Sequence, residues 1–418
     1  MVPAAAVPDR VAVIGAGMIG LATAWFLQDR GVAVTVLDRT GVAAGSSWGN
    51  AGWLTPGLAT PLPEPAVFRY GLRALLSPAS PVYVPPRADP RLLRFLAGFA
   101  RHSTTAHWKT SMAALVPLNR RALTAFDALA AGGVSAETVE AKSFLAAYRA
   151  EAERAVLLEE LEHINAAGQR IEFDVLSGAE AREVEPSLSD HVRAAIRLNG
   201  QRFLDPGRYV LQLAESVRRR GGTIRDGAET VAIRAGSGGV EIDLAGGGTE
   251  AADAVVIATG AWLGDLARPF GVRIPVQAGR GYSFSIPIEH VPAGPVYLPA
   301  QRVACTPLGD RLRVAGMMEF RSPGAPLDPR RIRAIADAAR PLLRGADLDT
   351  RTDEWVGSRP CTPDGLPLIG TTRSPRVFVA GGHGMWGITL GPVTGQLLAE
   401  RITTGHPPAE LGPFDPLR

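Results

Sequence analysis

A strand–glycine–helix pattern near the N-terminus is the feature that most constrains the fold of this chain. The apolar run Val11–Ile14 predicts a buried parallel strand, and the pattern Gly15-x-Gly17-x-x-Gly20 follows it directly. Gly15 permits a tight turn, Gly17 lets the backbone approach a pyrophosphate, and Gly20 lets the next helix pack on the strand. We expect that helix over Met18–Arg30, where its free N–H groups and positive dipole end face the phosphates.

A second predicted strand, Val32–Leu37, ends in the acidic residue Asp38. A carboxylate at this position can accept hydrogen bonds from ribose hydroxyls. The glycine pattern alone is weak support for a nucleotide site. The complete order of strand, helix, strand and acid instead predicts a Rossmann-like, dinucleotide-binding α/β unit.

Composition limits the class of protein. The chain has 418 residues, 46% hydrophobic and 20% charged, which predicts a globular protein of two domains. Its net charge of +3 is small for this length, so we expect no nucleic-acid partner. The two cysteines, Cys305 and Cys361, form neither a metal-ligand set nor a disulfide framework, which favours a cytoplasmic protein. Residues 1–10 do not read as a signal peptide, and no apolar run is long enough to predict a transmembrane segment. Peripheral attachment to a membrane stays open.

Several further elements follow from local signals. Asp205-Pro206 is typical of a helix start, and that helix is expected to run to Arg220. Asn199-Gly200 predicts a hairpin turn between strands at Arg193–Leu198 and near Phe203. Other helices are expected at 90–132, 150–168 and 328–344. The proline-rich residues 54–89 are expected to form a long ordered connection.

Nucleotide-domain signals are scattered along the chain. Besides the first unit, buried strands are predicted at Ala254–Ala258 and at Val377–Ala380. Elements of a different kind, including alternating strands, lie between them. We therefore expect two interleaved domains. The nucleotide-binding domain is assigned to residues 8–60, 206–265 and 351–418, and a substrate domain to residues 61–205 and 266–350.

Five motifs in order along the chain resemble one known family. After the first unit come Ser46-Ser47-x-x-Asn50-Ala51-Gly52, Asp205-Pro206-Gly207-Arg208-Tyr209, Ala258-Thr259-Gly260-Ala261-Trp262, Arg359-Pro-x-Thr-Pro-Asp364-Gly365 and Gly382-His383-Gly384. Together they resemble the flavin-dependent D-amino acid oxidase family. The chain is most similar to its D-amino acid dehydrogenase branch, with glycine and sarcosine oxidases as relatives. The resemblance implies a Rossmann-like FAD-binding domain interleaved with an α+β substrate domain built on an antiparallel sheet.

The resemblance also implies which residues bind FAD. Asp38 would bind the adenosine ribose, Arg39 would lie near the adenine, and Val231 would contact the adenine through its backbone. The loop from Ser46 to Gly52 would line the pyrophosphate and the flavin. The full expected set is Gly15, Gly17, Met18, Ile19, Gly20, Asp38, Arg39, Ser46, Ser47, Asn50, Ala51, Gly52, Val231, Gly260, Gly384, Met385, Trp386, Gly387, Ile388 and Thr389.

The segment from Gly382 to Gly387 repeats the G-x-G-x-x-G pattern. No second strand ending in an acid follows it, so a nicotinamide site cannot be completed. We expect instead a loop at one edge of the flavin, followed by a helix from about Thr389 whose positive end faces the ring. For His383 two interpretations stay open: it stabilises negative charge on the flavin, or it is held by hydrogen bonds of the loop.

Arg359 is the main candidate for the substrate side. A guanidinium binds a carboxylate through two parallel hydrogen bonds, and the family places an arginine of this motif on the substrate carboxylate. Tyr282 is expected either as a second polar contact or as a core tyrosine. Relatives with a covalent flavin link carry a cysteine where this chain has Gly357, so the FAD is expected to be non-covalent despite Cys361.

The function implied is the FAD-dependent oxidative deamination of a small amino acid, in which a hydride passes from Cα to the flavin. Sarcosine-oxidase relatives use a lysine near the flavin to activate oxygen. Both lysines of this chain, Lys109 and Lys142, lie outside the flavin motifs, which favours a quinone or another electron acceptor. Two alternatives stay open: an oxygen-using oxidase of glycine, sarcosine or proline derivatives, and a flavin-binding electron-transfer subunit of a larger complex.

Overall fold

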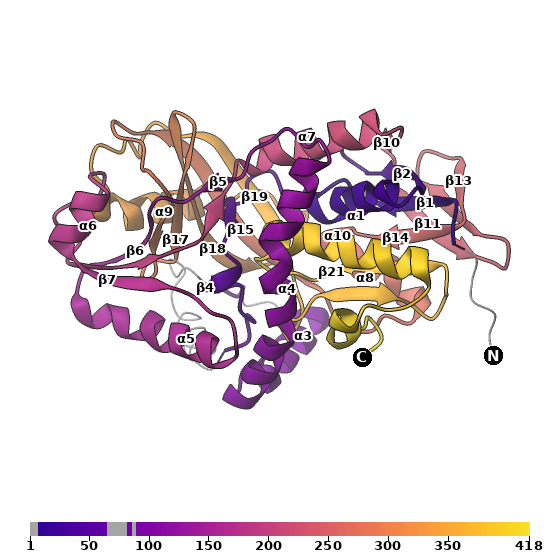
Figure 1. The fold of residues 1–418 in the computed structure, drawn as a ribbon, viewed down its shortest axis with the longest axis horizontal. Helices are drawn as coiled ribbons and strands as arrows, with labels where there is room; N and C mark the ends of the chain where they lie inside the picture. Colours follow the sequence, from indigo (N-terminus) through magenta and orange to yellow (C-terminus); the bar gives the residue numbers. More distant parts are fainter. Residues whose placement is uncertain (1–6, 65–81, 86–88) are drawn as a thin grey trace.

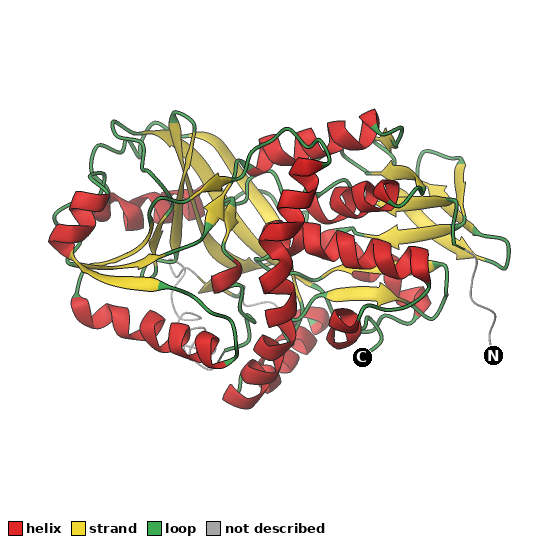
Figure 2. Cartoon of the chain, in the orientation of Figure 1, coloured by secondary structure: helices red, strands yellow, loops and turns green. Residues whose placement is uncertain are grey.

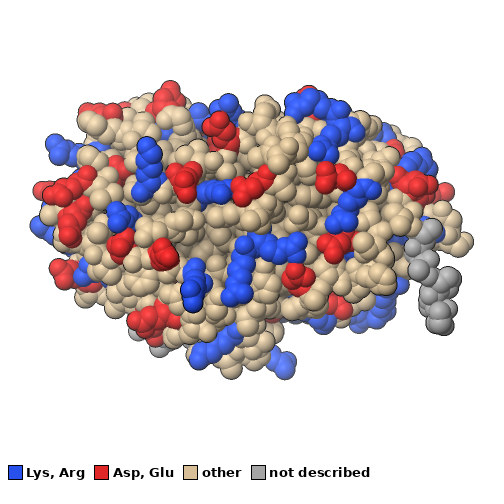
Figure 3. Space-filling model, viewed as in Figure 1, with Lys and Arg blue, Asp and Glu red and all other residues tan. Residues whose placement is uncertain are grey.

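A computed structural model describes residues 7–64, 82–85 and 89–418, so much of the expected 54–89 connection lies outside the described residues. Figure 1 shows two main sheets toward opposite ends of an elongated molecule, with helix α4 (Thr105–Ala131) running between them. Figure 2 shows that each sheet is accompanied by helices. Acidic and basic side chains are interspersed over the face drawn in Figure 3.

The first sheet has six strands among the described residues, in the order β10–β2–β1–β14–β21–β20. They are parallel except for β20, which pairs antiparallel with β21. Their bounds are β1 Arg10–Ile14, β2 Ala33–Leu37, β10 Thr223–Arg225, β14 Ala254–Ile257, β20 Leu368–Thr371 and β21 Val377–Gly381. The expected strand–helix–strand unit is confirmed, with α1 spanning Met18–Asp29.

Both faces of this sheet are covered, as a largely parallel sheet requires. Helix α1 packs on one face with α7 (Pro206–Arg219) and α10 (Gly387–Thr404). Asp205 caps α7 by accepting a bond from the Arg208 N–H, as its sequence predicts. The other face packs against a three-stranded meander of β11 (Thr230–Ala235), β12 (Val240–Leu244) and β13 (Thr249–Ala252).

The second sheet is mixed but mainly antiparallel. Its order is β19–β15–β18–β17–β16–β6–β8–β7, with β4 beside β18. The bounds are β4 Val82–Tyr83, β6 Phe144–Tyr148, β7 Phe173–Ser177, β8 Ala194–Leu198, β15 Gln277–Pro287, β16 Val296–Leu298, β17 Val303–Leu308, β18 Arg311–Phe320 and β19 Thr352–Cys361. Helices α6 (Gly178–Val184) and α9 (Pro329–Ala339) pack on one face. Helices α4 and α5 (Ala155–Ala166) pack on the other.

Several expected helices differ in their bounds. The region 90–132 forms two helices, α3 (Pro90–His102) and α4, because the chain turns at Ser103 and Thr104 caps the second helix. The 150–168 region begins with a 3₁₀ turn at Glu151–Arg154 before α5. Helix α9 ends at Ala339, and α10 begins at Gly387 rather than at Thr389.

The predicted hairpin at Asn199-Gly200 is wrong. Strand β8 pairs with β6 and β7, while β9 (Arg202–Phe203) pairs with β3 (Trp53–Leu54) and β5 (Val139–Glu140). Phe203 is buried opposite Trp53, so a distant strand outcompetes the local partner. No helix in the described part of the chain is both long and apolar enough to span a membrane.

Candidate functional site

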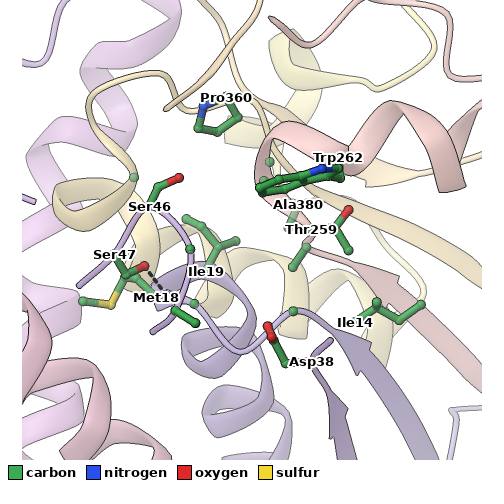
Figure 4. Close-up of a pocket in the computed structure, with 18 of the residues that line it drawn as sticks. Ile14, Met18, Ile19, Asp38, Ser46, Ser47, Thr259, Trp262, Pro360 and Ala380 are labelled. Carbon is green, nitrogen blue, oxygen red and sulfur yellow. Dashed lines mark hydrogen bonds between the residues drawn. The ribbon is translucent and has the colours of Figure 1, made fainter. Parts of the chain in front are cut away.

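A cavity opens at the carboxyl ends of β1, β2 and β14, with a volume of about 350 Å³. Figure 4 shows Ile14, Asp38 and Thr259, which stand at or just after the ends of these strands, around the same space. Ligands of parallel α/β sheets bind at this edge because the strand-to-helix loops meet there.

Each glycine of the first turn is favoured for a different steric reason. Gly15 has φ +113°, and a Cβ on it would come 2.5 Å from the carbonyl oxygen of Ala258. A Cβ on Gly20 would come 1.9 Å from the carbonyl oxygen of Gly15, so the helix can cross the strand only without a side chain there. A Cβ on Gly17 would meet only the Ser47 hydroxyl within 4 Å, at 3.2 Å, and would otherwise project into open space.

Asp38 is held in place by the backbone of its own turn. One carboxylate oxygen accepts the N–H of Ala16 at 2.8 Å. The other accepts the N–H groups of Thr40 and Gly41, both at 2.9 Å. A carboxylate has about four acceptor positions and three are used, so capacity remains for a hydroxyl of a ribose. Asp38 lines the cavity.

Helix α1 presents its N-terminus to the cavity. Its cap residue Gly17 supplies no side-chain hydrogen bond to the first turn. The Ser47 hydroxyl accepts the Met18 N–H at 3.1 Å, drawn as the dashed line in Figure 4, and Ile19 lines the cavity beside it. The helix end therefore offers N–H donors and the positive end of its dipole to an anionic group.

One end of the cavity combines an arginine, an indole and an irregular strand. The Arg39 guanidinium lies 3.7 Å from the centre of the Trp262 ring, a cation–π contact. Strand β11 has a register shift between Thr230 and Ala232, so Val231 falls at a bulge. A bulged residue leaves ladder hydrogen bonds unmade, which frees the Val231 backbone for a ligand. Val231 is 55% exposed and lines the cavity.

Two glycines and the start of α10 form a further part of the cavity wall. Gly260 and Gly384 have φ of +56° and +55°, and a Cβ on either would meet nothing within 4 Å. Both line the cavity, together with Gly387 and Ile388 of the first turn of α10. The cap residue of α10 makes no side-chain cap bond, so this helix also directs its positive end toward the cavity.

Trp355 connects the loop of residues 45–52 to strand β19. A Cβ on Gly49 would come 2.1 Å from the Trp355 indole, and a Cβ on Gly357 would come 1.9 Å from it. The indole therefore occupies the space of both absent side chains. The Ser46 hydroxyl also donates to the carbonyl of Ser358 on the same strand.

Arg359 projects from β19 into the cavity. Its Nη1 donates to the Met317 carbonyl at 2.6 Å, and Met317 has a left-handed φ of +68°. Gly281 on the neighbouring strand leaves room for the guanidinium. Burial lowers the pKa of Arg359, but a guanidinium stays charged at neutral pH. Arg359 is half-buried and forms no ion pair within the described residues, so its guanidinium is available to an anionic ligand in the cavity.

His383 is 4% exposed and lines the cavity. Its Nε2 is 2.9 Å from the Thr394 hydroxyl, and its Nδ1 has no partner among the described residues. Burial lowers the pKa of His383 to about 3, so the imidazole is neutral at physiological pH. In this structure His383 is thus a neutral histidine held by a hydrogen bond of its surroundings.

Tyr282 does not reach the cavity. Gly281 faces Arg359, so its neighbours on the strand face the opposite side of the sheet. The Tyr282 hydroxyl donates to the Glu319 carboxylate at 2.7 Å, and the side chain is 1% exposed in the core under α9. The structure places it as a core tyrosine.

Most other expected residues surround the cavity. Those that line it are Gly15, Gly17, Met18, Ile19, Asp38, Arg39, Ser46, Ser47, Asn50, Val231, Gly260, Gly384, Met385, Gly387 and Ile388. Those that do not are Gly20, Ala51, Gly52, Trp386 and Thr389. The Thr389 hydroxyl donates instead to the Trp53 carbonyl, and Gly52 donates its N–H to the Asn50 side chain.

Lining residues outside the expected set include Thr230, Thr259, Trp262 and Pro360. Trp262 belongs to a motif that signals the family, but its stacking on Arg39 joins residues far apart in sequence. These features fit FAD. An open helix end suits the pyrophosphate, the fixed Asp38 suits a ribose, and the space beside Gly260 and Gly384 suits a ring.

Comparisons with known proteins place this arrangement in context. Residues 10–401 match the family described as DAO, FAD dependent oxidoreductase. A D-amino acid dehydrogenase of Cereibacter sphaeroides is 32% identical over 411 residues, covering 96% of this chain and 93% of the relative. One of Xanthobacter autotrophicus is 31% identical, covering 94% and 95%.

Solved structures share the fold. The glycine oxidase of Geobacillus kaustophilus superposes with a TM-score of 0.73 at 24% identity, covering 98% of each chain. The iminodiacetate oxidase of a Chelativorans species superposes with a TM-score of 0.70 at 22% identity, covering 97% of this chain and 99% of that one. The electron-transfer-subunit alternative finds no support in these similarities.

Proposed function

We propose that this chain, which belongs to the DAO family of FAD-dependent oxidoreductases, oxidises the α-carbon of a D-amino acid. The product is an imino acid that water converts to an oxo acid and ammonia. D-amino acid dehydrogenases of two bacteria, similar over nearly the whole chain, support both the reaction and the D configuration.

The position of Arg359 in the cavity is the observation that carries this proposal. Its side chain is half-buried, lines the FAD cavity and has no anionic partner among the described residues. A partly desolvated cation without a partner is unfavourable, and the carboxylate of an amino acid supplies the missing charge through two hydrogen bonds. The Met317 carbonyl and Gly281 hold the guanidinium in one orientation, so the α-carbon of a bound substrate is also fixed.

The chemistry requires positioning more than acid–base groups. When bound, FAD supplies a two-electron acceptor for the hydride that leaves Cα. The substrate enters with a neutral amine, and the nitrogen lone pair forms the C=N bond as the hydride departs. His383 is neutral and its Nε2 is engaged with Thr394, so it contributes a polar but uncharged wall. The N-terminus of α10 adds a positive dipole end at the same side.

We assign FAD binding to residues 8–60, 206–265 and 351–418, and substrate binding to residues 61–205 and 266–350. Strand β19, which carries Arg359, lies in the FAD-binding range but pairs within the larger sheet, so it connects the two parts. We place the adenine between Arg39 and Val231 and the flavin beside Gly384. The FAD is non-covalent, because Gly357 offers no thiol at that position.

The electron acceptor is a quinone or another carrier rather than oxygen activated by a lysine. Lys109 and Lys142 are both exposed, and neither lines the cavity. A comparison of turnover with oxygen and with an artificial dye tests this part of the proposal. Faster turnover with oxygen than with the dye would contradict it.

Anaerobic reduction of the bound flavin tests the main proposal. D-amino acids should bleach the flavin absorbance of the purified, FAD-loaded protein, and the L-enantiomers should not. Arg359→Lys should keep FAD but reduce flavin reduction by about 100-fold or more, because a lysine cannot form the paired hydrogen bonds. Arg333→Lys, exposed on α9, is the matched control. If no D-amino acid, glycine, sarcosine or proline derivative bleaches the flavin, the proposal fails.

A further inference from the structure

A smaller cavity, of about 10 Å³, adjoins the FAD cavity. The two cavities share a wall formed by His383, Gly384 and Met385. Beyond that wall the smaller cavity is lined by Thr60 and Trp386. The shared wall therefore leads from the cavity that Arg359 lines toward Thr60.

Polar contacts continue from Thr60 to a pair of acidic side chains. The Trp386 indole N–H donates to the Thr60 carbonyl at 2.8 Å, which fixes the residue. The Thr60 hydroxyl lies 3.4 Å from a carboxylate oxygen of Glu160, which projects from α5. Glu160 in turn lies close enough to Glu64 for the negative charge of Glu64 to disfavour ionisation of Glu160.

Glu64 and Glu160 lie deep in the structure but remain partly accessible to solvent. Burial is the largest cause that raises the pKa of Glu64, and it also raises that of Glu160, to about 7. Both side chains nevertheless keep partial exposure. Side chains that are deep and still accessible line a concave surface rather than a packed core.

Two tyrosines face the same place. Tyr297 packs its ring 5.3 Å from Trp53 and receives a hydrogen bond from Arg302. The Tyr148 hydroxyl is buried, has no hydrogen-bond partner among the described residues, and lies near both Glu160 and Tyr297. An unpartnered buried hydroxyl is costly, and its oxygen can accept a bond from an N–H donor.

When both carboxyl groups are ionised, the charges of this cluster do not balance. Glu64 and Glu160 face one guanidinium, that of Arg302, while His163 and Glu159 lie at the exposed surface of α5. The acceptors that point inward are two carboxylates and the Tyr148 oxygen. A ligand group that carries positive charge and only N–H donors complements both the charge and the hydrogen-bonding pattern.

We infer that Glu160, Glu64 and Tyr148 form a subsite for the positively charged end of the substrate side chain, so that this enzyme prefers amino acids ending in an ammonium or guanidinium group. The inference rests on the proposed function, because it names the substrate class of the same site. Glu160 and Glu64 supply the charge, Tyr148 accepts a hydrogen bond, and Thr60 positions Glu160.

Isosteric substrates test the subsite. The FAD-loaded enzyme is reduced anaerobically by D-lysine and by D-norleucine, which differ by the terminal ammonium. We expect the second-order rate constant of flavin reduction to be about 10-fold or more higher for D-lysine. Glu160→Gln should bring this ratio close to one. Glu162→Gln, exposed on the same helix, should leave the ratio unchanged.

Different failures have different meanings. Equal or faster reduction by D-norleucine in the wild-type protein overturns the subsite but leaves the proposed function standing. If no amino acid reduces the flavin, the proposed function fails, and the subsite is then judged by binding alone. For that purpose 6-aminohexanoate and hexanoate are titrated into the holoenzyme, and the change in the flavin spectrum is followed. Tighter binding of the amino compound supports the subsite, equal or weaker binding overturns it, and this measurement also serves if Glu160→Gln does not fold.

Discussion

The backbone of Gly281 lies against the guanidinium of Arg359: a Cβ on Gly281 would come 2.2 Å from Nη2 and 2.3 Å from Cζ. The two residues stand on paired strands, β15 and β19, of the larger sheet. The absence of a side chain at position 281 is therefore what lets the guanidinium lie where it does.

Gly281→Ala should displace the guanidinium without removing it. We expect KM for the amino acid to rise by about 10- to 100-fold, since small displacements of a positioning group cost this much. FAD affinity should stay unchanged. Steady-state kinetics with a dye acceptor measure the effect, and Gly246→Ala, in an exposed turn with open space around it, is the control. Wild-type KM in Gly281→Ala would contradict a role for Arg359 in substrate binding.

Gly384→Ala should weaken FAD binding. The new methyl group would project into the space that we assign to the flavin, and we expect the Kd for FAD to rise by roughly 10-fold, about 1.4 kcal/mol. Gly405→Ala separates this effect from backbone strain, because Gly405 is also left-handed and open but caps α10 at its far end. FAD titration of the apoprotein measures both, and equal losses in the two variants would argue against the assignment.

His383 predicts a loss of stability in acid. Burial lowers its pKa to about 3 in the folded protein, against about 6.5 in the unfolded chain, so the unfolded chain binds the extra proton between these values. The stabilisation is complete above about pH 6.5 and declines as pH falls, by about 2 kcal/mol between pH 7.5 and pH 5. Unfolding by urea at both pH values should show a smaller decline in His383→Gln. An equal decline in both proteins would show that His383 titrates normally.

The acidic subsite predicts a pH dependence that differs between substrates. The pKa of Glu160 is raised to about 7 by burial and by Glu64, while Arg302 and the Thr60 hydroxyl oppose the rise. The negative charge of the subsite therefore increases as pH rises through 7. The ratio of flavin-reduction rate constants for D-lysine and D-norleucine should increase from pH 6 to pH 8, and Glu160→Gln should abolish the increase. A flat ratio in the wild type would contradict this assignment.

Local patterns in the sequence were sufficient to predict the first strand–helix–strand unit. Gly20 approaches Gly15, and Asp38 accepts the Ala16 N–H, so both contacts stay within that unit and follow from its spacing. The same holds for Asp205, which caps the helix that it precedes. The approach of Gly15 to Ala258, by contrast, depends on a strand far along the chain.

Contacts between distant segments could not be predicted in this way. The side of the sheet that Tyr282 faces depends on how its strand is placed against β18, where the register shifts between Arg280 and Tyr282. Phe203 pairs with Trp53 rather than across Asn199-Gly200, because burial against a remote strand outweighs a favourable turn. The proximity of Glu64 and Glu160 could not be predicted either, since the two residues come together only through the packing of α5.

The Trp355 indole fills the space beside both Gly49 and Gly357, so the loop of residues 45–52 and the strand that carries Arg359 pack against one side chain. A displacement of the loop should therefore reach the larger sheet through this indole. Since residues of the same loop line the cavity assigned to FAD, we expect cofactor binding to order β19 together with the loop. Assembly of the substrate site would then be linked to acquisition of the cofactor.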